Sequence, residues 1–448
     1  MVKVIEETRE QQDQRMAWWR EAKFGMFIHW GLGAVTAGMR KGVVPSGWGG
    51  LEQRATISIK EDEQLAEKFN PIRFNPKEWV QVAKEAGMKW MVPQVKNHDG
   101  FCMWDTKLTD FNVVKATPFK RDPFKELAEA CREEGMRLGF YYSQRPDWHH
   151  PDGGNDWDYD LSKQNYSRYL REYVKPQLRE LLTNYGPIAV AWFDQGTPTP
   201  ELAMELKQLV RELQPGTIIS GRIAEHPFFG AAGEFRGTRG VSNIGDYMTA
   251  GDQEIPDERI KRDWETCACT NDTWSYNSYD HNWKSAGTLV QWLVAIVSRG
   301  GNYLLNVGPT AKGIIPEPCV RELEGVGEWL KVNGESIYGA TASPIPSPVT
   351  VPVQPETSLV ASASANPRVA PYQCTAKLGK YYIHIFAWPW DGKFKVSRVG
   401  KEVKRAYLLA DPNHGELEFN QEGEDVVINV PDEAPDPIDT VVVLEINK

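Results

Sequence analysis

The chain has 448 residues, 41% of them hydrophobic, and a formal net charge of −10 with a pI near 5.5. A chain of this length is expected to fold as a large domain with a smaller one. The acidic balance offers no basic face for a phosphate backbone and argues against nucleic-acid binding.

Residues 1–25 are polar and charged and contain no apolar run suited to a signal peptide or a membrane span. We therefore expect a soluble protein without membrane insertion. It would be cytoplasmic, or periplasmic or secreted if a signal peptide has been removed. The six cysteines are too few and too scattered for a disulfide framework, and Cys267-x-Cys269 lacks the second ligand pair that zinc sites show. No metal site is predicted.

Residues 1–340 repeat one pattern, a short apolar strand that ends in polar or aromatic residues, followed by a helix. The helices include 75–87, where Asn75 is the expected N-cap, and 122–135, capped by Asp122. This alternation predicts parallel strands, and its length favours a (β/α)8-type barrel over an open sheet. The predicted strands are 24–30, 89–99, 137–143, 188–194, 217–222, 242–248 and 302–309.

After residue 340 the composition changes to a proline-rich stretch, 341–355, which we interpret as a linker. Residues 356–448 then contain short β-rich runs separated by Gly, Pro, Asn and Asp. They predict a small C-terminal antiparallel β-sandwich that packs against the barrel and carries no catalytic group. The β-rich runs are 381–390, 393–399, 406–410, 425–430 and 440–446.

Chemically reactive residues follow the predicted barrel strands, at the end of the barrel where active sites of this architecture lie. Buried charges need water or partners, and a shared site would supply both. The residues in this position are His29, His98, Asp99, Tyr142, Asp194, Arg222 and Asp246.

Asp194 ends an apolar strand, directly after Trp192 and Phe193. A carboxylate held against an aromatic wall and met by Arg222 can stay ionised and attack an electrophilic carbon. The alternative is a structural aspartate that caps the next helix.

Glycoside hydrolysis needs a second carboxyl group to protonate the leaving oxygen. The acidic segment 245–267 offers Asp246, Asp252, Glu254, Glu258 and Glu265, and spacing alone does not choose among them. His29 and His98 are suited to bind sugar hydroxyls, while Trp30, Trp48 or Trp104 covers the other sugar face. Each histidine alone could equally be structural.

An ordered set of motifs resembles glycoside hydrolase family 29, the α-L-fucosidase family. The motifs span the predicted barrel and read KFGMFIHWG, AKEAGMKWMV, HDGFCMWDTKLTDFN, RLGFYYS, WFD, DWETC, SRGGNYLLNVGPTAKGIIP and VGEWLKVNGESIYG. The resemblance implies a barrel followed by a β-sandwich, and an exo-acting α-L-fucosidase that retains configuration by double displacement without metal or organic cofactor. Its partner would be an oligosaccharide or polysaccharide, and a homo-oligomer is compatible with the sequence.

The same resemblance assigns roles to single residues. Asp194 matches the family's nucleophile, and the sugar subsite would be lined by His29, His98, Tyr142, Trp192 and Arg222. The family's acid/base is commonly a glutamate in a G-D-Y-x-T-P-E-Q-E-I-P-like loop, which here reads GDYMTAGDQEIP. We expect Glu254 to be the acid/base, with Asp252 and Glu265 as rivals.

Two departures concern the sugar. Asn97 replaces the first histidine of the common K-H-H-D-G motif, and SGWGG keeps Trp48 but has Gly47 where the family has a glutamate. Both changes affect residues that would bind ring hydroxyls, so the sugar preference can differ. One alternative is an α-L-galactosidase acting on a galactan-type polysaccharide. Another is a catalytically weak glycan-binding protein.

Overall fold

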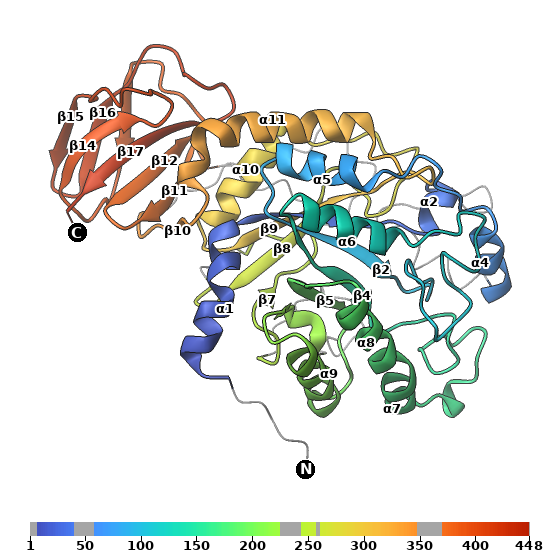
Figure 1. The fold of residues 1–448 in the computed structure, drawn as a ribbon. Helices are drawn as coiled ribbons and strands as arrows, with labels where there is room; N and C mark the ends of the chain where they lie inside the picture. The colour runs from blue at the N-terminus through green and yellow to red at the C-terminus, as the bar shows by residue number, and fades with distance from the viewer. Residues whose placement is uncertain (1–6, 40–57, 225–242, 257–259, 347–369, 448) are drawn as a thin grey trace.

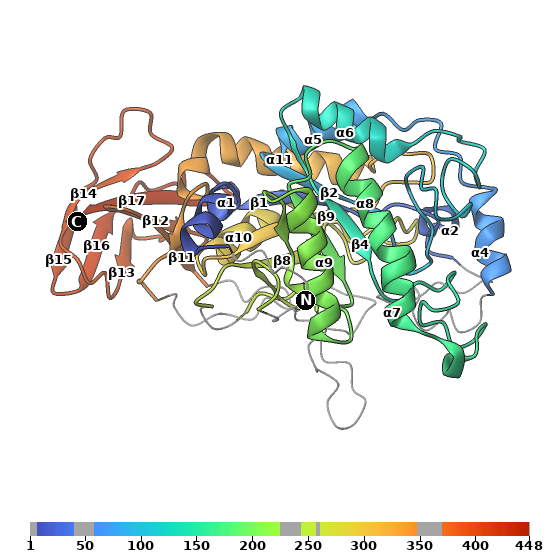
Figure 2. The same ribbon diagram turned by 60° about the horizontal axis from the view of Figure 1, so that its bottom comes forward.

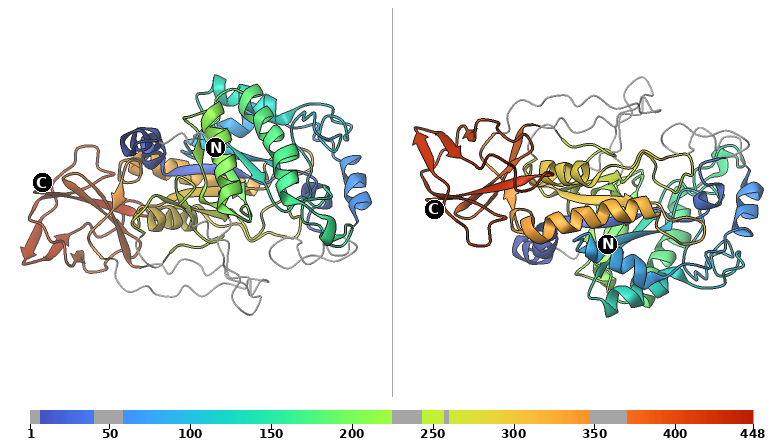
Figure 3. Two further views of the ribbon diagram at one scale, coloured as in Figure 1. Left: turned by 90° about the horizontal axis from the view of Figure 1, so that it is seen from below. Right: turned by 90° about the horizontal axis from the view of Figure 1, so that it is seen from above.

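The structure, a computed structural model, describes residues 7–39, 58–224, 243–256, 260–346 and 370–447 (Figure 1). It contains a curled sheet of parallel strands surrounded by helices, and two antiparallel sheets formed by the C-terminal residues. The antiparallel sheets lie at one end of the molecule, beside α10 and α11 (Figures 1 and 3). The predicted fold class, a (β/α)8-type barrel followed by a small antiparallel sandwich, is confirmed.

The parallel sheet has the strand order β6-β5-β4-β2-β1-β9-β8-β7, and β3 pairs with β2. The strands are β1 (Phe24–Ile28), β2 (Trp90–Lys96), β3 (Arg137–Leu138), β4 (Phe140–Ser143), β5 (Val190–Asp194), β6 (Ile218–Ile219), β7 (Met248–Thr249), β8 (Trp264–Cys269) and β9 (Asn302–Val307).

The ends of this sheet, β6 and β7, are not joined by a strand ladder within the described residues. Hydrogen bonds of the flanking residues connect them instead, among them two between Ile219 of β6 and Asp246, which precedes β7. Asp246 N–H donates to Ile219 O at 2.8 Å, and Ile219 N–H donates to the Asp246 carboxylate at 2.7 Å. We call this line between β6 and β7 the seam of the barrel.

The helices carry the capping devices that the sequence predicted. Asn75 accepts a hydrogen bond at the start of α5, Asp122 does so at the start of α6, and a proline begins each helix. In Figure 2, α8 and α9 lie side by side along the outside of the sheet. The α-helices are α1 (Arg9–Ala22), α2 (Gly33–Thr36), α4 (Ile59–Ala66), α5 (Pro76–Glu85), α6 (Pro123–Glu133), α7 (Tyr166–Tyr169), α8 (Lys175–Asn184), α9 (Pro200–Leu213), α10 (Ala286–Val297) and α11 (Glu317–Asn333). The 3-10 helices are η1 (Leu161–Lys163), η3 (Gly221–Ile223) and η4 (Gly334–Ser336), and η2 (Leu170–Val174) is a π-helix.

The C-terminal domain consists of a five-stranded sheet, β10-β11-β12-β17-β14, and a three-stranded sheet, β13-β16-β15. The strands are β10 (Thr341–Ala342), β11 (Tyr372–Lys377), β12 (Lys380–Ile385), β13 (Lys393–Val396), β14 (Val403–Leu408), β15 (Phe419–Glu422), β16 (Asp425–Asn429) and β17 (Thr440–Ile446). The domain boundaries stay predictions. Thr341 and Ala342, at the start of the predicted linker, pair with β11, and residues 347–355 lie outside the described residues.

The barrel and the sandwich share one apolar core. Tyr382, Tyr407, Val441 and Val443 of the sandwich belong to the same buried cluster as the barrel helices. Trp329 of α11 also donates its indole N–H to Asp439 O at 3.0 Å. The sandwich therefore completes the packing of the barrel.

Candidate active site

The register between β4 and β5 determines which side chains face the barrel interior. Tyr141 lies opposite Trp192, and Ser143 lies opposite Asp194. Because side chains alternate along a strand, these four share one face of the sheet. Tyr141 and Trp192 pack with Phe27 and Leu304 in a buried cluster inside the barrel. Ser143 and Asp194, the last residues of β4 and β5, therefore face the barrel interior at the C-terminal ends of the strands.

Asp194 is held as a carboxylate by three neighbours. Its Oδ1 accepts a hydrogen bond from Arg222 at 3.2 Å, and its Oδ2 accepts one from the Tyr141 hydroxyl at 2.8 Å. His98 Nε2 is 3.7 Å from Oδ2. Burial alone would raise the pKa of Asp194, but Arg222, His98 and Tyr141 together hold it below its usual value. Asp194 is therefore an ionised, oriented carboxylate.

A second carboxyl group, Asp252, contacts the same arginine. One guanidinium nitrogen of Arg222 binds Asp194 and another binds Asp252 Oδ1. The Cys267 thiol lies 3.7 Å from the same oxygen of Asp252. Burial raises the pKa of Asp252 above its usual value, against the opposing effect of Arg222. The two aspartates thus have pKa values shifted in opposite directions, as an acid and a nucleophile require.

The two predicted histidines both lie in this group. His29 Nδ1 is 2.7 Å from Asn306 Oδ1, and Asn306 donates its own amide N–H to Trp274 O. The histidine must therefore donate from Nδ1, which leaves Nε2 as an acceptor. Burial lowers the pKa of His29 to about 4, so its ring is neutral at neutral pH.

His98 is oriented by Ser143. Its Nδ1 is 2.7 Å from Ser143 Oγ, which itself donates to Pro146 O. The Ser143 oxygen therefore accepts from Nδ1, and Nε2 faces Asp194. Asn97 lies beside this pair, with its side-chain oxygen 2.8 Å from the His98 backbone N and 3.4 Å from the Tyr141 hydroxyl.

Trp192 lies beneath these groups. Its ring stacks on Tyr141 with centroids 5.5 Å apart, and the Arg222 guanidinium lies 4.9 Å above it. Its indole N–H donates to Glu265 at 2.9 Å. Among the candidates for the acid/base, Glu265 therefore lies further inside the barrel than Asp252. Glu254 Oε2 accepts a hydrogen bond from the Gly251 N–H of its own loop.

Some predicted residues lie elsewhere. The Tyr142 hydroxyl donates to Gln177 of α8, on the helix side of the sheet, because Tyr142 has the opposite strand parity to Asp194. Asp246 forms ion pairs with Arg15 and Arg211 at the seam. Asp99 accepts a hydrogen bond from Phe101 N–H. Trp48 lies outside the described residues.

Two of the tryptophans that were predicted to cover one face of the sugar, Trp30 and Trp104, lie in the core instead. Trp30 packs among Phe69, Phe74 and Trp79, and Trp104 is fully buried. Sequence reasoning missed Tyr141, Trp148 and Trp274. Trp148 contacts the His98 ring, and Trp274 contacts the His29 ring. Of these three residues, only Tyr141 could have been found from the sequence. Side chains alternate along a strand, so Trp192 faces the same side as Asp194, and Tyr141 lies opposite Trp192 on the neighbouring strand.

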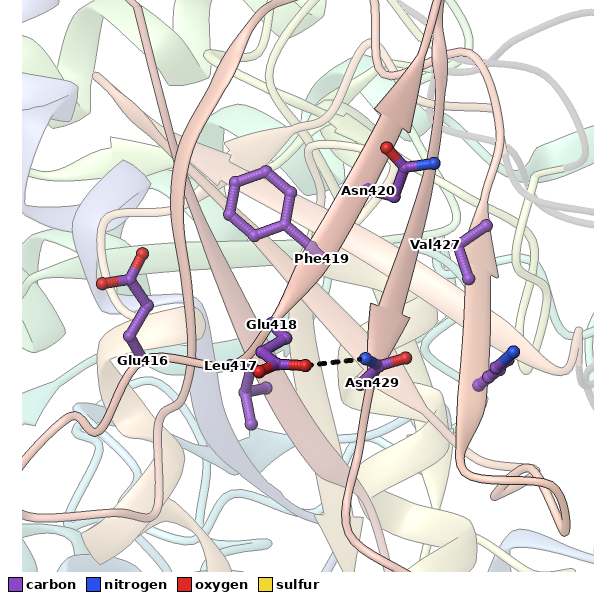
Figure 4. Close-up of a pocket in the computed structure, with 8 residues that line it drawn as sticks. Glu416, Leu417, Glu418, Phe419, Asn420, Val427 and Asn429 are labelled. Atoms are coloured by element: carbon purple, nitrogen blue, oxygen red, sulfur yellow. Dashed lines mark hydrogen bonds between the residues drawn. The ribbon is translucent and has the colours of Figure 1, made fainter.

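The structure also has a hollow on the C-terminal domain, along the three-stranded sheet (Figure 4). It is lined by Lys393, Glu416–Asn420, Val427 and Asn429, and Asn429 donates to Glu418 at 3.3 Å. It lacks the paired, oppositely shifted carboxyls found at the barrel. Across the described ranges we find no His, Cys, Asp and Glu cluster suited to a metal ion and no helix long and apolar enough to cross a membrane.

A parallel (β/α) barrel with two carboxyl groups converging at its strand ends is an arrangement found in glycoside hydrolases. A sequence profile of the family described as alpha-L-fucosidase matches residues 2–335. The chain therefore belongs to the α-L-fucosidase family of glycoside hydrolases, family 29, which confirms the predicted family and enzyme class.

Relatives and solved structures agree with this assignment. The chain is 30% identical to human plasma α-L-fucosidase over 350 residues, covering 74% of this chain and 71% of that protein. It resembles the structure of α-L-fucosidase isoenzyme 1 from Paenibacillus thiaminolyticus with a TM-score of 0.80 and 33% identity, covering 98% and 100% of the two chains. A mutant α-L-fucosidase from Bacteroides thetaiotaomicron, solved as a trapped covalent intermediate, gives a TM-score of 0.80 at 26% identity and 97% coverage of each chain.

Proposed function

We propose that the protein is a retaining exo-α-L-fucosidase that releases terminal α-L-fucose from glycans. The observation that carries this proposal is the Asp194–Arg222–Asp252 group, in which one guanidinium holds an ionised carboxylate and a carboxyl of raised pKa. The trapped covalent intermediate of the Bacteroides relative supports a double displacement through a glycosyl-enzyme.

Asp194 is the nucleophile. Tyr141 and Arg222 each occupy one of its oxygens, which fixes the carboxylate plane and keeps it deprotonated at working pH. Attack on the anomeric carbon forms the covalent sugar ester as the leaving oxygen takes up a proton. His29, fixed through Nδ1, presents Nε2 to a sugar hydroxyl, and His98, fixed in the same way, directs Nε2 toward Asp194.

Asp252 is the acid/base in preference to Glu254, the residue expected from the sequence. Asp252 contacts Arg222, the arginine that also contacts the nucleophile, and burial raises the pKa of Asp252, the direction that a general acid requires. The Glu254 carboxylate instead binds Gly251 N–H in its own loop, and the Glu254 backbone oxygen binds Thr266.

The test uses 4-nitrophenyl α-L-fucoside and a natural α-L-fucoside with the parent protein and Asp194→Ala, Asp252→Ala and Glu254→Ala. Loss of a general acid costs about 10²–10⁴-fold, and an activated nitrophenolate needs little protonation. Asp252→Ala should therefore lose much more activity on the natural substrate and recover turnover with azide, giving the α-azide. Glu254→Ala should not. The reverse pattern would make Glu254 the acid/base.

Two outcomes would change the proposed function itself. Turnover of 4-nitrophenyl α-L-galactoside at a higher kcat/KM than the fucoside would make the protein an α-L-galactosidase, the candidate that Asn97 favours because it replaces a histidine beside the nucleophile. Glycan binding without turnover of either substrate would make it a binding protein.

A further inference from the structure

Glu265 of β8 is a fully buried carboxyl group inside the barrel, 1% exposed. Its Oε1 accepts hydrogen bonds from the Trp192 indole at 2.9 Å and from the Tyr247 hydroxyl at 3.1 Å. Its Oε2 has no partner that meets hydrogen-bond geometry among the described residues, and the Trp19 indole, whose N–H is also unpaired, faces this carboxyl group. An ionised carboxylate with one bare oxygen is more costly in such a place than a neutral carboxylic acid, which leaves a single uncharged O–H donor unpaired.

The contacts of Trp192 connect Glu265 to the reacting groups. The Trp192 ring supports Tyr141 on one side and the Arg222 guanidinium on another, and both of these bind Asp194. Rotation or displacement of the indole would therefore move two of the contacts that orient the nucleophile. Glu265 itself has no hydrogen bond to either aspartate.

The charged and titratable groups that face Glu265 come from the surrounding elements. Tyr247 precedes β7, Arg222 lies in η3 and Cys267 is two residues further along β8, while α1 contributes the Trp19 indole and β9 the uncharged Asn302 as register partner. Arg222 is the sole cation in this set, and Asp194 and Asp252 already bind it.

We propose that Glu265 is a positioning residue of the catalytic site, which as a neutral carboxylic acid fixes the Trp192 indole and leaves the Arg222 charge to the two aspartates. This proposal rests on the proposed function and assigns Glu265 a role different from that of an acid/base. Burial raises the pKa of Glu265 to about 7, so the neutral form dominates in mildly acidic solution.

The first experiment compares Glu265→Gln with Glu265→Leu. Glutamine is neutral and keeps an acceptor oxygen for Trp192 and Tyr247, so Glu265→Gln should keep kcat in mildly acidic buffer within about threefold of the parent. Leucine leaves both donors unpaired, so Glu265→Leu should lower kcat by about tenfold or more, with a smaller change in KM. Equal loss in both variants, with azide rescue, would make Glu265 the acid/base and overturn the proposal.

The second experiment needs no turnover and so separates this proposal from the proposed function. Tryptophan fluorescence of the parent protein, followed against pH, should show a step near the Glu265 pKa of about 7. The step should be absent in Glu265→Gln and in Trp192→Phe. A step that persists in Glu265→Gln, or no step in the parent, contradicts a neutral Glu265 in contact with Trp192.

The third experiment measures the melting temperature Tm as a function of pH. A raised folded-state pKa means that stability is greatest below the unfolded pKa near 4.5 and falls as pH rises through about 7. The Tm of Glu265→Gln should therefore increase relative to the parent over this range. If the parent hydrolyses no fucoside but shows the fluorescence step and the Tm trend, the function fails and the Glu265 contact stands.

Discussion

Tyr141 and Tyr142 are adjacent in the chain, yet their hydroxyls lie on opposite sides of the sheet. Tyr141 donates to Asp194, the proposed nucleophile, and Tyr142 donates to Gln177 of α8. The difference follows from strand parity alone. The same substitution, tyrosine to phenylalanine, should therefore affect catalysis at position 141 and only stability at position 142.

Tyr141→Phe removes a hydrogen bond to a charged group, which is worth about 1.5–3 kcal/mol. Because that bond lowers the pKa of Asp194, its loss should raise this pKa and move the acidic limb of the kcat/KM profile to higher pH by about one unit or more. Tyr142→Phe should lower the free energy of unfolding by about 1 kcal/mol without moving the limb. Equal pH profiles for both variants would contradict the assignment of Tyr141.

At this scale the sequence predicted much of the site. The strand-end positions of His29, His98, Asp194 and Arg222 follow from apolar runs that end in polar residues, and the structure brings all four together. The sequence placed Asp246 in the site but did not predict its ion pairs, because its partners Arg15 and Arg211 lie on helices distant in the chain. The local sequence pattern predicts which strand end carries a side chain, but it does not predict the partners that come from distant parts of the chain.

The loop after β4 is held by a fully buried ion pair. Lys96 of β2 binds Asp147 at 2.8 Å, and the Tyr169 hydroxyl contacts both. Asp147 also accepts the backbone N–H of His149 and His150. The neighbouring residue, Trp148, donates its backbone N–H to His98 O. This ion pair therefore fixes the segment that contacts His98.

Asp147→Asn should leave the Lys96 charge buried without a counter-ion and lower the free energy of unfolding by about 3–5 kcal/mol. Lys163→Met is the matched control, since it removes the exposed Lys163–Asp160 pair and should cost less than about 1 kcal/mol. Denaturant titration measures both. If the two variants differ by less than 1 kcal/mol, as surface pairs would, the buried pair does not hold the loop.

Element boundaries were less predictable than element order. The predicted strand 137–143 is divided into β3 and β4 at Gly139, where a side chain would collide with Val190. Of the predicted strand 242–248, only Met248 lies in a strand of the described residues, β7 (Met248–Thr249), and β8, with its sequence WETCAC, was not predicted as a strand. Inward polar residues such as Glu265 interrupt the apolar pattern from which strands are recognised.

At the scale of the whole molecule, the two domains are joined through polar groups as well as the shared core. Within the C-terminal domain, His384 of β12 is 2.6 Å from Asp439, both side chains are fully buried, and the Asp439 backbone oxygen accepts the indole N–H of Trp329 in the barrel helix α11. The Thr375 hydroxyl of β11 donates to Ser336 O of η4. The domains should therefore unfold together.

His384→Ala should leave the buried Asp439 carboxyl without its main partner and lower the free energy of unfolding by about 2–3 kcal/mol. Scanning calorimetry should show one cooperative transition that moves to lower temperature, with no change for His281→Ala, whose side chain is exposed. Two transitions, of which only one moves, would show that the sandwich unfolds independently.

The seam of the barrel runs through the catalytic site. Arg222 follows β6 and Asp252 follows β7, so their ion pair crosses the one line where the curled sheet lacks a described ladder. On the proposed roles, Asp252 loses and regains a proton in every turnover, and its attraction to Arg222 changes each time. The charge on Asp252 therefore sets the strength of an ion pair that bridges the two edges of the curled sheet, so that the reaction and the closure of the barrel share one contact.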